Sequence, residues 1–164
     1  MYLKVISSNY LCYQIGKRKY NRGRLVDGHW IFGIVERDSK NYRLEICPQN
    51  KRDEKTLLSL LQRHVLPGTI IYSDMWKAYH NLQHHGYVHG VVNHSRNFVD
   101  PDTGVHTNTI ESCWRPLKNR IERGGVGKES KLAQHLCEYM WIKAHVDDED
   151  IFLSFINAIC MYYK

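Results

Sequence analysis

The first third of the chain carries apolar residues in patterns typical of β-strands. Residues 2–15 are rich in β-branched and aromatic side chains and predict a strand with weak alternation. Residues 29–37 form a nearly continuous apolar run, as expected for a central strand covered on both faces. After a turn at 38–41, residues 42–46 alternate cleanly between polar and apolar. This part of the chain therefore predicts three antiparallel strands.

The remaining pattern predicts helices with two short strands between them. Apolar residues from Leu57 to Val65 recur at helical spacing, and Asp53 stands where a helix cap is expected. Short strands are predicted at 69–72 and 87–92, on either side of a short helix. Three more helices are expected at about 107–123, at about 130–145, and after a cap at Asp147 or Asp148, with apolar residues from Ile151 to Ile159. Together these elements predict an α/β fold.

Composition is ordinary for one globular domain. Hydrophobic residues make up 43% and charged residues 24% of the 164 positions. No apolar run approaches the ~20 residues that span a bilayer, and residues 1–11 lack the apolar block of a secretory signal. We therefore expect an intracellular protein without membrane contact, nuclear if its source is eukaryotic. The five cysteines form no C-x-x-C pair, which favours buried free thiols over disulfides or a zinc ribbon.

The positive charge is concentrated in one segment. The net charge is +6, and five basic residues fall within eight positions of the block GKRKYNRGR, so the remainder holds 18 basic against 17 acidic residues. Such a cluster around a tyrosine suits a phosphate backbone. A solvated basic loop or a nuclear-import signal fits it equally well. The candidate DNA-binding residues are Lys17, Arg18, Lys19, Arg22 and Arg24.

Two acidic residues occupy places that suit metal-dependent phosphodiester cleavage. Asp74 follows a short apolar strand, and Glu111 lies in the first turns of a helix, with 36 residues between them. Carboxylates at a strand end and on an adjacent helix can ligate two divalent ions about 3.5–4 Å apart. Lys118 lies two helical turns after Glu111 and so projects from the same face, in reach of a DNA phosphate. Taken separately, these residues also fit a helix cap and a solvated ion pair.

The stretches around these residues closely resemble the Merlin superfamily of DNA transposases and their bacterial insertion-sequence (ISXO-like) relatives. The most specific motifs are SD-x-W-x-AY, VNHS-x-x-FVDP-x-TG-x-HTNTIES-x-W and GKRKYNRGR, within a resemblance that runs from about Gly16 to His145. It implies a ribonuclease-H-like fold, an α/β mixed sheet with flanking helices and a C-terminal helical extension. We expect the catalytic domain in residues 1–125, with a divergent first strand at 1–15, and the extension in 126–164, packed on the same domain.

The resemblance also implies a chemistry and partners. Members use a D-D-E set with two Mg²⁺ or Mn²⁺ ions, nick transposon ends and join the freed 3′-hydroxyl to target DNA, generally as homodimers on double-stranded DNA. Matched position by position, Asp74 is the second Asp, Glu111 is the third acid and Lys118 is a basic residue that follows it. His106 and Asn108 stand in the same motif, where positioning roles are expected.

The chain departs from the family at the first Asp. Members end their first strand with an Asp-Glu-Ser-like motif, and an ungapped match puts its Asp at Leu11. Residues 1–26 contain no acid, and Asp27 belongs to the turn before the second strand. A two-metal site with this ligand replaced should lose most of its metal affinity. The sequence thus predicts a DDE-type transposase domain without its first catalytic Asp; the alternative is an inactive, transposon-derived DNA-binding or assembly protein.

Weaker candidates lie outside this set. Trp76 and Trp114 could stack on bases, although large apolar residues pack in the core by default. The apolar helix faces at 130–159 are expected in the core, and could equally support self-association. A zinc site is conceivable among the local histidines, but surface histidines in a DNA-facing region are favoured; these are His80, His84, His85, His89 and His94.

Overall fold

The structure is a computed structural model, and two of the predictions fall on residues that it leaves out. It describes residues 7–15, 28–37, 39, 41–93, 99–101, 104–124 and 129–163. The basic block that carries the five candidate DNA-binding residues, and His94 of the histidine group, lie outside these residues.

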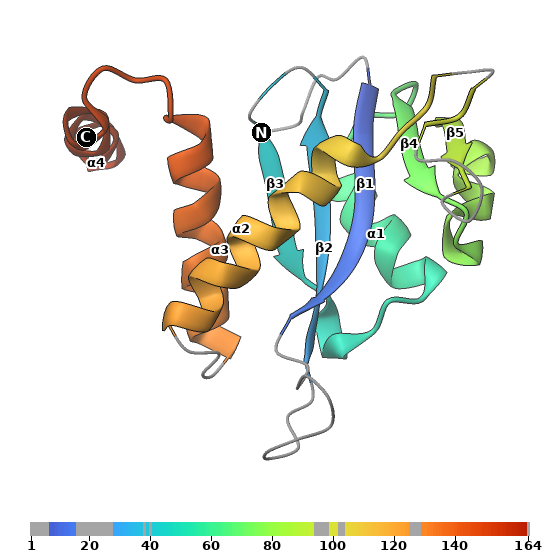
Figure 1. The fold of residues 1–164 in the computed structure, drawn as a ribbon, viewed down its shortest axis with the longest axis horizontal. Coiled ribbons are helices and arrows are strands. Elements are labelled where there is room, and N and C mark those ends of the chain that lie inside the picture. Colours follow the sequence, from blue (N-terminus) through green and yellow to red (C-terminus); the bar gives the residue numbers. More distant parts are fainter. Residues whose placement is uncertain are drawn as a thin grey trace.

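A five-stranded mixed sheet forms the centre of the molecule, in the order β3-β2-β1-β4-β5 (Figure 1). β1 (Ser7–Ile15) pairs antiparallel with β2 (His29–Glu36), which pairs antiparallel with β3 (Tyr42–Ile46). On its other side β1 pairs in parallel with β4 (Ile70–Asp74), and β4 pairs in parallel with β5 (Val88–Val92). The predicted antiparallel set of three strands and the mixed α/β sheet are confirmed.

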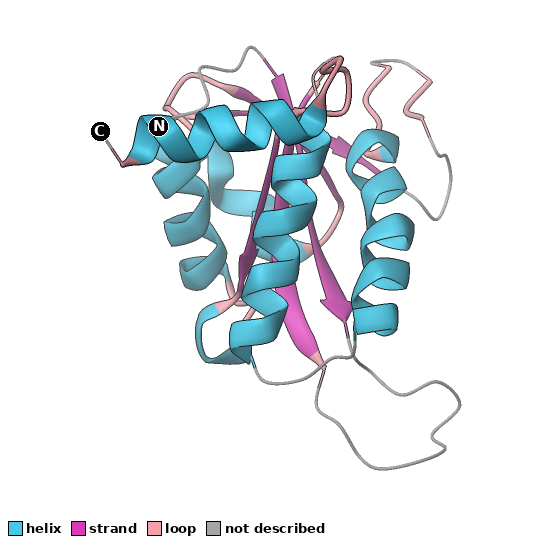
Figure 2. Ribbon diagram, turned by 90° about the vertical axis from the view of Figure 1, so that its left-hand side faces the viewer, coloured by secondary structure: helices cyan, strands magenta, loops and turns pink. Residues whose placement is uncertain are grey.

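Helices cover both faces of this sheet (Figures 1 and 2). One face carries α1, and the opposite face carries α2 and α3, each over its own cluster of buried side chains. None of the helices among the described residues is long and apolar enough to cross a membrane. The helices are α1 (Glu54–His64), α2 (Asn108–Gly124), α3 (Glu129–Ala144) and α4 (Ile151–Tyr162), with short 3-10 helices η2 (Pro48–Asn50) and η3 (Lys77–His85).

α1 begins where the sequence predicts. The Thr56 N–H donates to the Asp53 carboxylate at 2.9 Å, which satisfies one of the free N–H groups at the start of the helix. Leu57 and Leu61 are completely buried and pack with Phe32 of β2. The helical spacing of these leucines therefore places the apolar side of α1 on the sheet.

α2 lies very close to the sheet where it crosses Gly33 of β2. A Cβ atom added at Gly33 would lie 2.5 Å from the Trp114 ring and 3.2 Å from Ile110. Trp114 is 4% exposed and stacks on Tyr13 of β1, with ring centroids 5.3 Å apart. It is therefore a core residue, which confirms the default expectation for it, and only glycine leaves room for its ring.

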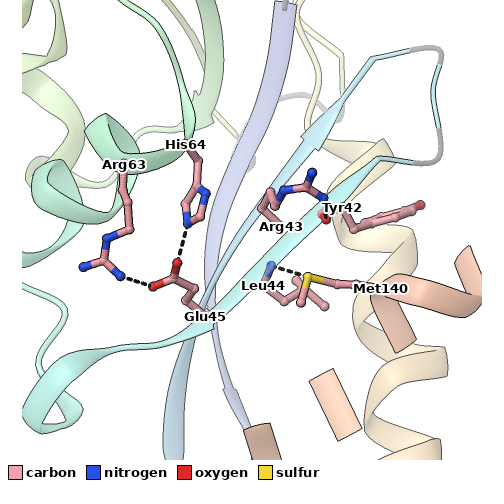
Figure 3. A network of polar contacts seen from close by, with 7 residues as sticks. All are labelled: Tyr42, Arg43, Leu44, Glu45, Arg63, His64 and Met140. Carbon is pink, nitrogen blue, oxygen red and sulfur yellow. Dashed lines mark hydrogen bonds and ion pairs between the residues drawn. The ribbon is translucent and has the colours of Figure 1, made fainter. Parts of the chain in front are cut away.

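β3 is an edge strand that is held from both faces (Figure 3). On one face the Glu45 carboxylate accepts from Arg63 of α1 at 2.7 Å and also contacts His64. On the other face the Leu44 side chain packs in the α2–α3 cluster with Met140, whose sulfur also accepts from the Leu44 N–H at 3.1 Å. Successive residues of the strand therefore bind opposite helix layers, as the alternation of side chains requires.

The C-terminal helix differs from its prediction in two ways. Its cap is Asp150, which accepts from the N–H groups of Phe152 and Leu153, and not Asp147 or Asp148. No residue of α4 is buried, so the expectation of a core face is wrong for residues 151–159. Apolar spacing predicted the helix correctly but could not show whether a surface exists for it to cover. The division into 1–125 and 126–164 stays a prediction.

The five cysteines differ in burial, although the sequence predicts that all of them are buried. Cys47 and Cys113 are buried, Cys12 is half-buried, and Cys137 and Cys160 are exposed. The prediction of buried thiols is therefore wrong for the last two, which lie on outward-facing positions of α3 and α4.

Candidate functional site

Asp74 is the last residue of β4 and faces the α2 side of the sheet. Ile71 and Ser73 are buried, and Ile71 packs on the α1 side, so the alternating residues Tyr72 and Asp74 point the other way. The Asp74 side chain is half-buried, and its Oδ1 accepts from the Trp76 N–H at 3.2 Å. The carboxylate thus lies at the carboxyl end of a strand, as predicted.

Leu11 lies at the level of Asp74 on the neighbouring strand. The parallel register places Asn9 opposite Tyr72, and two further residues along both strands bring Leu11 opposite Asp74. On its other side Leu11 pairs with Gly33. Its side chain is half-buried and packs against the α2 cluster, so it shares the face of Asp74. An apolar side chain therefore occupies the position level with Asp74 at which the family resemblance implies an Asp.

Glu111 enters the same region from the first turn of α2. The helix begins beside β4 and then crosses β1 and β2 (Figure 1). Ile110 is buried over Gly33, the partner of Leu11, and Glu111 follows it on the flank of the buried stripe. The buried Thr107 hydroxyl donates to the Glu111 carboxylate at 2.6 Å and fixes its orientation.

Lys118 and Asn108 take different positions on α2. Lys118 is half-buried on the flank that also carries Glu111, since seven residues make close to two turns. Asn108 is the first residue of the helix and is exposed. Asp74 thus lies at the end of β4 and Glu111 in the first turn of α2, while Lys118 lies two turns further along that helix. The roles assigned to these three residues remain predictions.

Arg37, which no pattern in the sequence indicated, contacts residues that shortly precede the two candidate acids in the chain. The Arg37 guanidinium lies 4.8 Å from the centre of the Tyr72 ring and donates to His106 Nε2. His106 pairs with Val99 just before α2, so this contact connects the end of β2 to the segment that positions Thr107 and the helix. Arg37 and His106 are 69 residues apart, and no local pattern predicts such a contact.

The side chains present do not fit a site for two divalent ions. Such a site needs several oxygen ligands from carboxylates, and here Asp74 and Glu111 stand with Leu11. Within the part of the chain that the structure describes, no three His, Cys, Asp or Glu side chains gather as metal ligands would. Among the described residues, the donor set therefore lacks the carboxylate that the resemblance implies at position 11.

Among the described histidines, His80, His84 and His85 are exposed, as expected for surface residues, and His89 is half-buried. His89 Nε2 lies 2.8 Å from Ser73 Oγ. Burial lowers the pKa of His89, and the nearby His80 lowers it further. The zinc interpretation finds no support among the four histidines described, because no third ligand joins them there.

Comparison with known proteins shows the family to which the chain belongs. Residues 7–141 match the family described as ISXO2-like transposase domain, so the match includes β1. An uncharacterized transposase-like protein of Haemophilus influenzae is 26% identical over 96 residues, which cover 57% of this chain and 76% of that protein.

Two solved structures share the fold at low sequence identity. The catalytic core domain of BIV integrase has a TM-score of 0.52 at 13% identity, with 97% of this chain and 99% of that chain covered. A chain of the simian T-cell lymphotropic virus intasome, solved with PP2A regulatory subunit B56 gamma, has a TM-score of 0.54 at 14% identity, with 83% and 47% covered. The fold is thus the ribonuclease-H-like fold of integrase cores, and the chain belongs to the family of ISXO2-like transposase domains.

Proposed function

We propose that this chain is a transposase domain that binds DNA but does not cleave it. The observation that carries the proposal is the position of Leu11, level with Asp74 and packed on the α2 cluster near Glu111. DDE transposases and integrases generally use divalent metal ions. Because Leu11 offers no oxygen to a cation, the remaining carboxylates are expected to bind such ions weakly.

The remaining polar residues suit a role in binding and positioning. Glu111 is held by Thr107, and Asp74 is held by the backbone after its strand. In an intact site these two would be the second and third acids of the set. Lys118, on the flank of α2 that carries Glu111, is proposed to contact a DNA phosphate.

The proposed partners are double-stranded DNA and a second copy of the chain. Membership of a transposase family supports DNA binding, and one structural neighbour belongs to an intasome, which is a multi-chain assembly. Lys17, Arg18, Lys19, Arg22 and Arg24 are proposed as phosphate contacts on the basis of charge.

Restoring the missing carboxylate tests the catalytic half of the proposal. With Mn²⁺ and supercoiled plasmid, the wild-type chain is expected to leave the plasmid intact. Leu11→Asp is expected to nick it, and the neutral, isosteric Leu11→Asn is not. Metal-dependent nicking by the wild type that Asp74→Asn abolishes would show an active enzyme and overturn the proposal.

Salt dependence of binding tests the DNA half. Each lost phosphate contact should reduce the magnitude of the slope of log K against log [salt] by about 0.9 for duplex DNA, so alanine at all five basic positions should reduce it by roughly 4.5. Matched replacements of Lys51, Lys55 and Lys77, which are exposed elsewhere on the fold, should change it little. An unchanged slope in the five-fold variant would exclude the basic block as the DNA contact.

A further inference from the structure

α4 is an apolar helix with almost nothing packed against it. Residues 151–163 include no charged side chain. Phe152, Met161 and Tyr162 are 68%, 76% and 82% exposed. Figure 2 shows α4 lying across the end of α3, where the ring of Phe155 meets Trp141 edge-on at 5.4 Å. Leaving so many large apolar groups in water is unfavourable, so this helix is expected to have a partner.

The charges around α4 favour a protein partner over a nucleic acid or a lipid surface. Helices that bind anionic membranes carry Lys or Arg on their polar face, and α4 has none. The segment that leads into it, Asp147–Asp150, is entirely acidic and would repel phosphate groups. An uncharged helix can also meet its own copy without like-charge repulsion.

The exposed apolar area has the size that a dimer needs. Aromatic side chains bury roughly 150–250 Å² each, and on that scale the exposed apolar residues of α4, counted over all sides of the helix, offer roughly 900 Å² per chain. A standard stable interface buries about 800 Å² per partner. In a two-fold dimer each chain contributes its α4 and its groove, so the contact between helix and groove is formed twice.

The same chain also has an apolar groove that α4 of a second copy can contact. A groove of about 240 Å³ lies between the edge strand β3 and α3, lined by Leu44, Ile46, Ala133, Leu136 and Cys137, with Glu45 at its border. Figure 3 shows the Glu45 carboxylate turned toward Arg63 and His64 of α1, while Leu44 points toward Met140 of α3. The groove is therefore apolar on the side where a helix would pack.

We propose that α4 of each chain packs against β3 and α3 of a second copy and places apolar side chains in the groove between them. The exposed apolar helix, its lack of charge and the apolar groove on the same chain carry this inference. It does not depend on whether the chain cleaves DNA, because none of these residues belongs to the carboxylate site.

Two exposed cysteines allow a direct test, since Cys160 lies on α4 and Cys137 lines the groove. A short bismaleimide added to the full chain should give a product of two chains in which peptide mapping finds Cys160 linked to Cys137. Cys137→Ser should remove that link. A link between these cysteines only within one chain, only between two Cys160 residues, or no two-chain product would overturn the proposed packing.

Sedimentation provides an independent measurement. The wild-type chain should be dimeric in the upper micromolar range, and Phe152→Glu combined with Met161→Glu should be monomeric with unchanged circular dichroism, because both side chains are exposed. Ser59→Glu with Gln62→Glu adds the same charge on exposed positions of α1 and should remain dimeric. A monomeric wild type, or a dimer that survives the α4 substitutions, would contradict the proposal.

Discussion

Gly33→Ala should loosen the contact between α2 and the sheet, and with it the position of Glu111. The new methyl group would lie 2.5 Å and 2.8 Å from two carbons of the Trp114 ring. To restore ordinary contact at 3.4 Å, the ring must retreat by about 0.9 Å. Trp114 is buried and stacked on Tyr13, so it cannot move without shifting its neighbours.

The size of the effect follows from two opposing contributions. Extra groups forced into a packed core cost about 1–3 kcal/mol. Replacing glycine by alanine within a strand regains about 0.5–1 kcal/mol of chain entropy. The net loss in the free energy of unfolding is therefore about 0–2.5 kcal/mol with a midpoint of about 1.3 kcal/mol, and the midpoint lowers Tm by roughly 3–5 °C for a chain of this length.

Urea denaturation followed by tryptophan fluorescence measures this loss. Gly90→Ala provides a comparison, because its methyl group would lie 2.7 Å from the ring of Tyr72, which is half-buried and can move more readily. Gly33→Ala should cost more than Gly90→Ala. If Gly33→Ala were stabilising, or cost less than Gly90→Ala, the close packing of Trp114 on β2 would be refuted.

Three further predictions concern single side chains. Thr107→Val should lower stability by about 1 kcal/mol in urea denaturation, because the hydroxyl that donates to Glu111 is lost; a neutral variant would argue against that bond. The pKa of His89 is lowered by burial and by His80, so the neutral side chain should contribute fully to stability above pH 6.5, and this contribution should be lost as the pH falls below that value. His89→Asn should reduce this pH dependence of stability. An unchanged pH profile in the variant would contradict the prediction. Burial raises the pKa of Cys113 to about 12, so in dilute, monomeric protein at pH 8 iodoacetamide should modify exposed Cys137 and Cys160 first and Cys113 only after unfolding. Equal rates by mass spectrometry would contradict the burial.

Local pattern was enough to predict most of the elements. The strands alternate or run apolar according to whether one or both faces are covered, and Asp53 with its leucines fixed the start of α1. The motif around Asp74 and Glu111 indicated which acids approach each other, because it carried a family resemblance that spacing alone does not provide. These features depend on residues close together in the sequence.

Other features depend on contacts between distant residues, which the sequence does not encode locally. The Arg37–His106 contact joins β2 to the segment before α2, and both residues are ordinary polar positions in their own neighbourhoods. That Leu11 lies level with Asp74 follows from the parallel register of β1 and β4, which are far apart in the chain. Apolar spacing in 151–159 predicted a helix correctly but placed it in the core, because spacing describes what a helix needs to bury and not what covers it.

Mn²⁺ binding, counted by electron paramagnetic resonance of the free ion, tests the central claim most directly. The wild-type chain is expected to bind no stoichiometric Mn²⁺ at sub-millimolar concentration, whereas Leu11→Asp should bind it and Leu11→Asn should not. Stoichiometric binding by the wild type that Asp74→Asn abolishes would show that the site is complete without an acid at position 11, and would contradict the account.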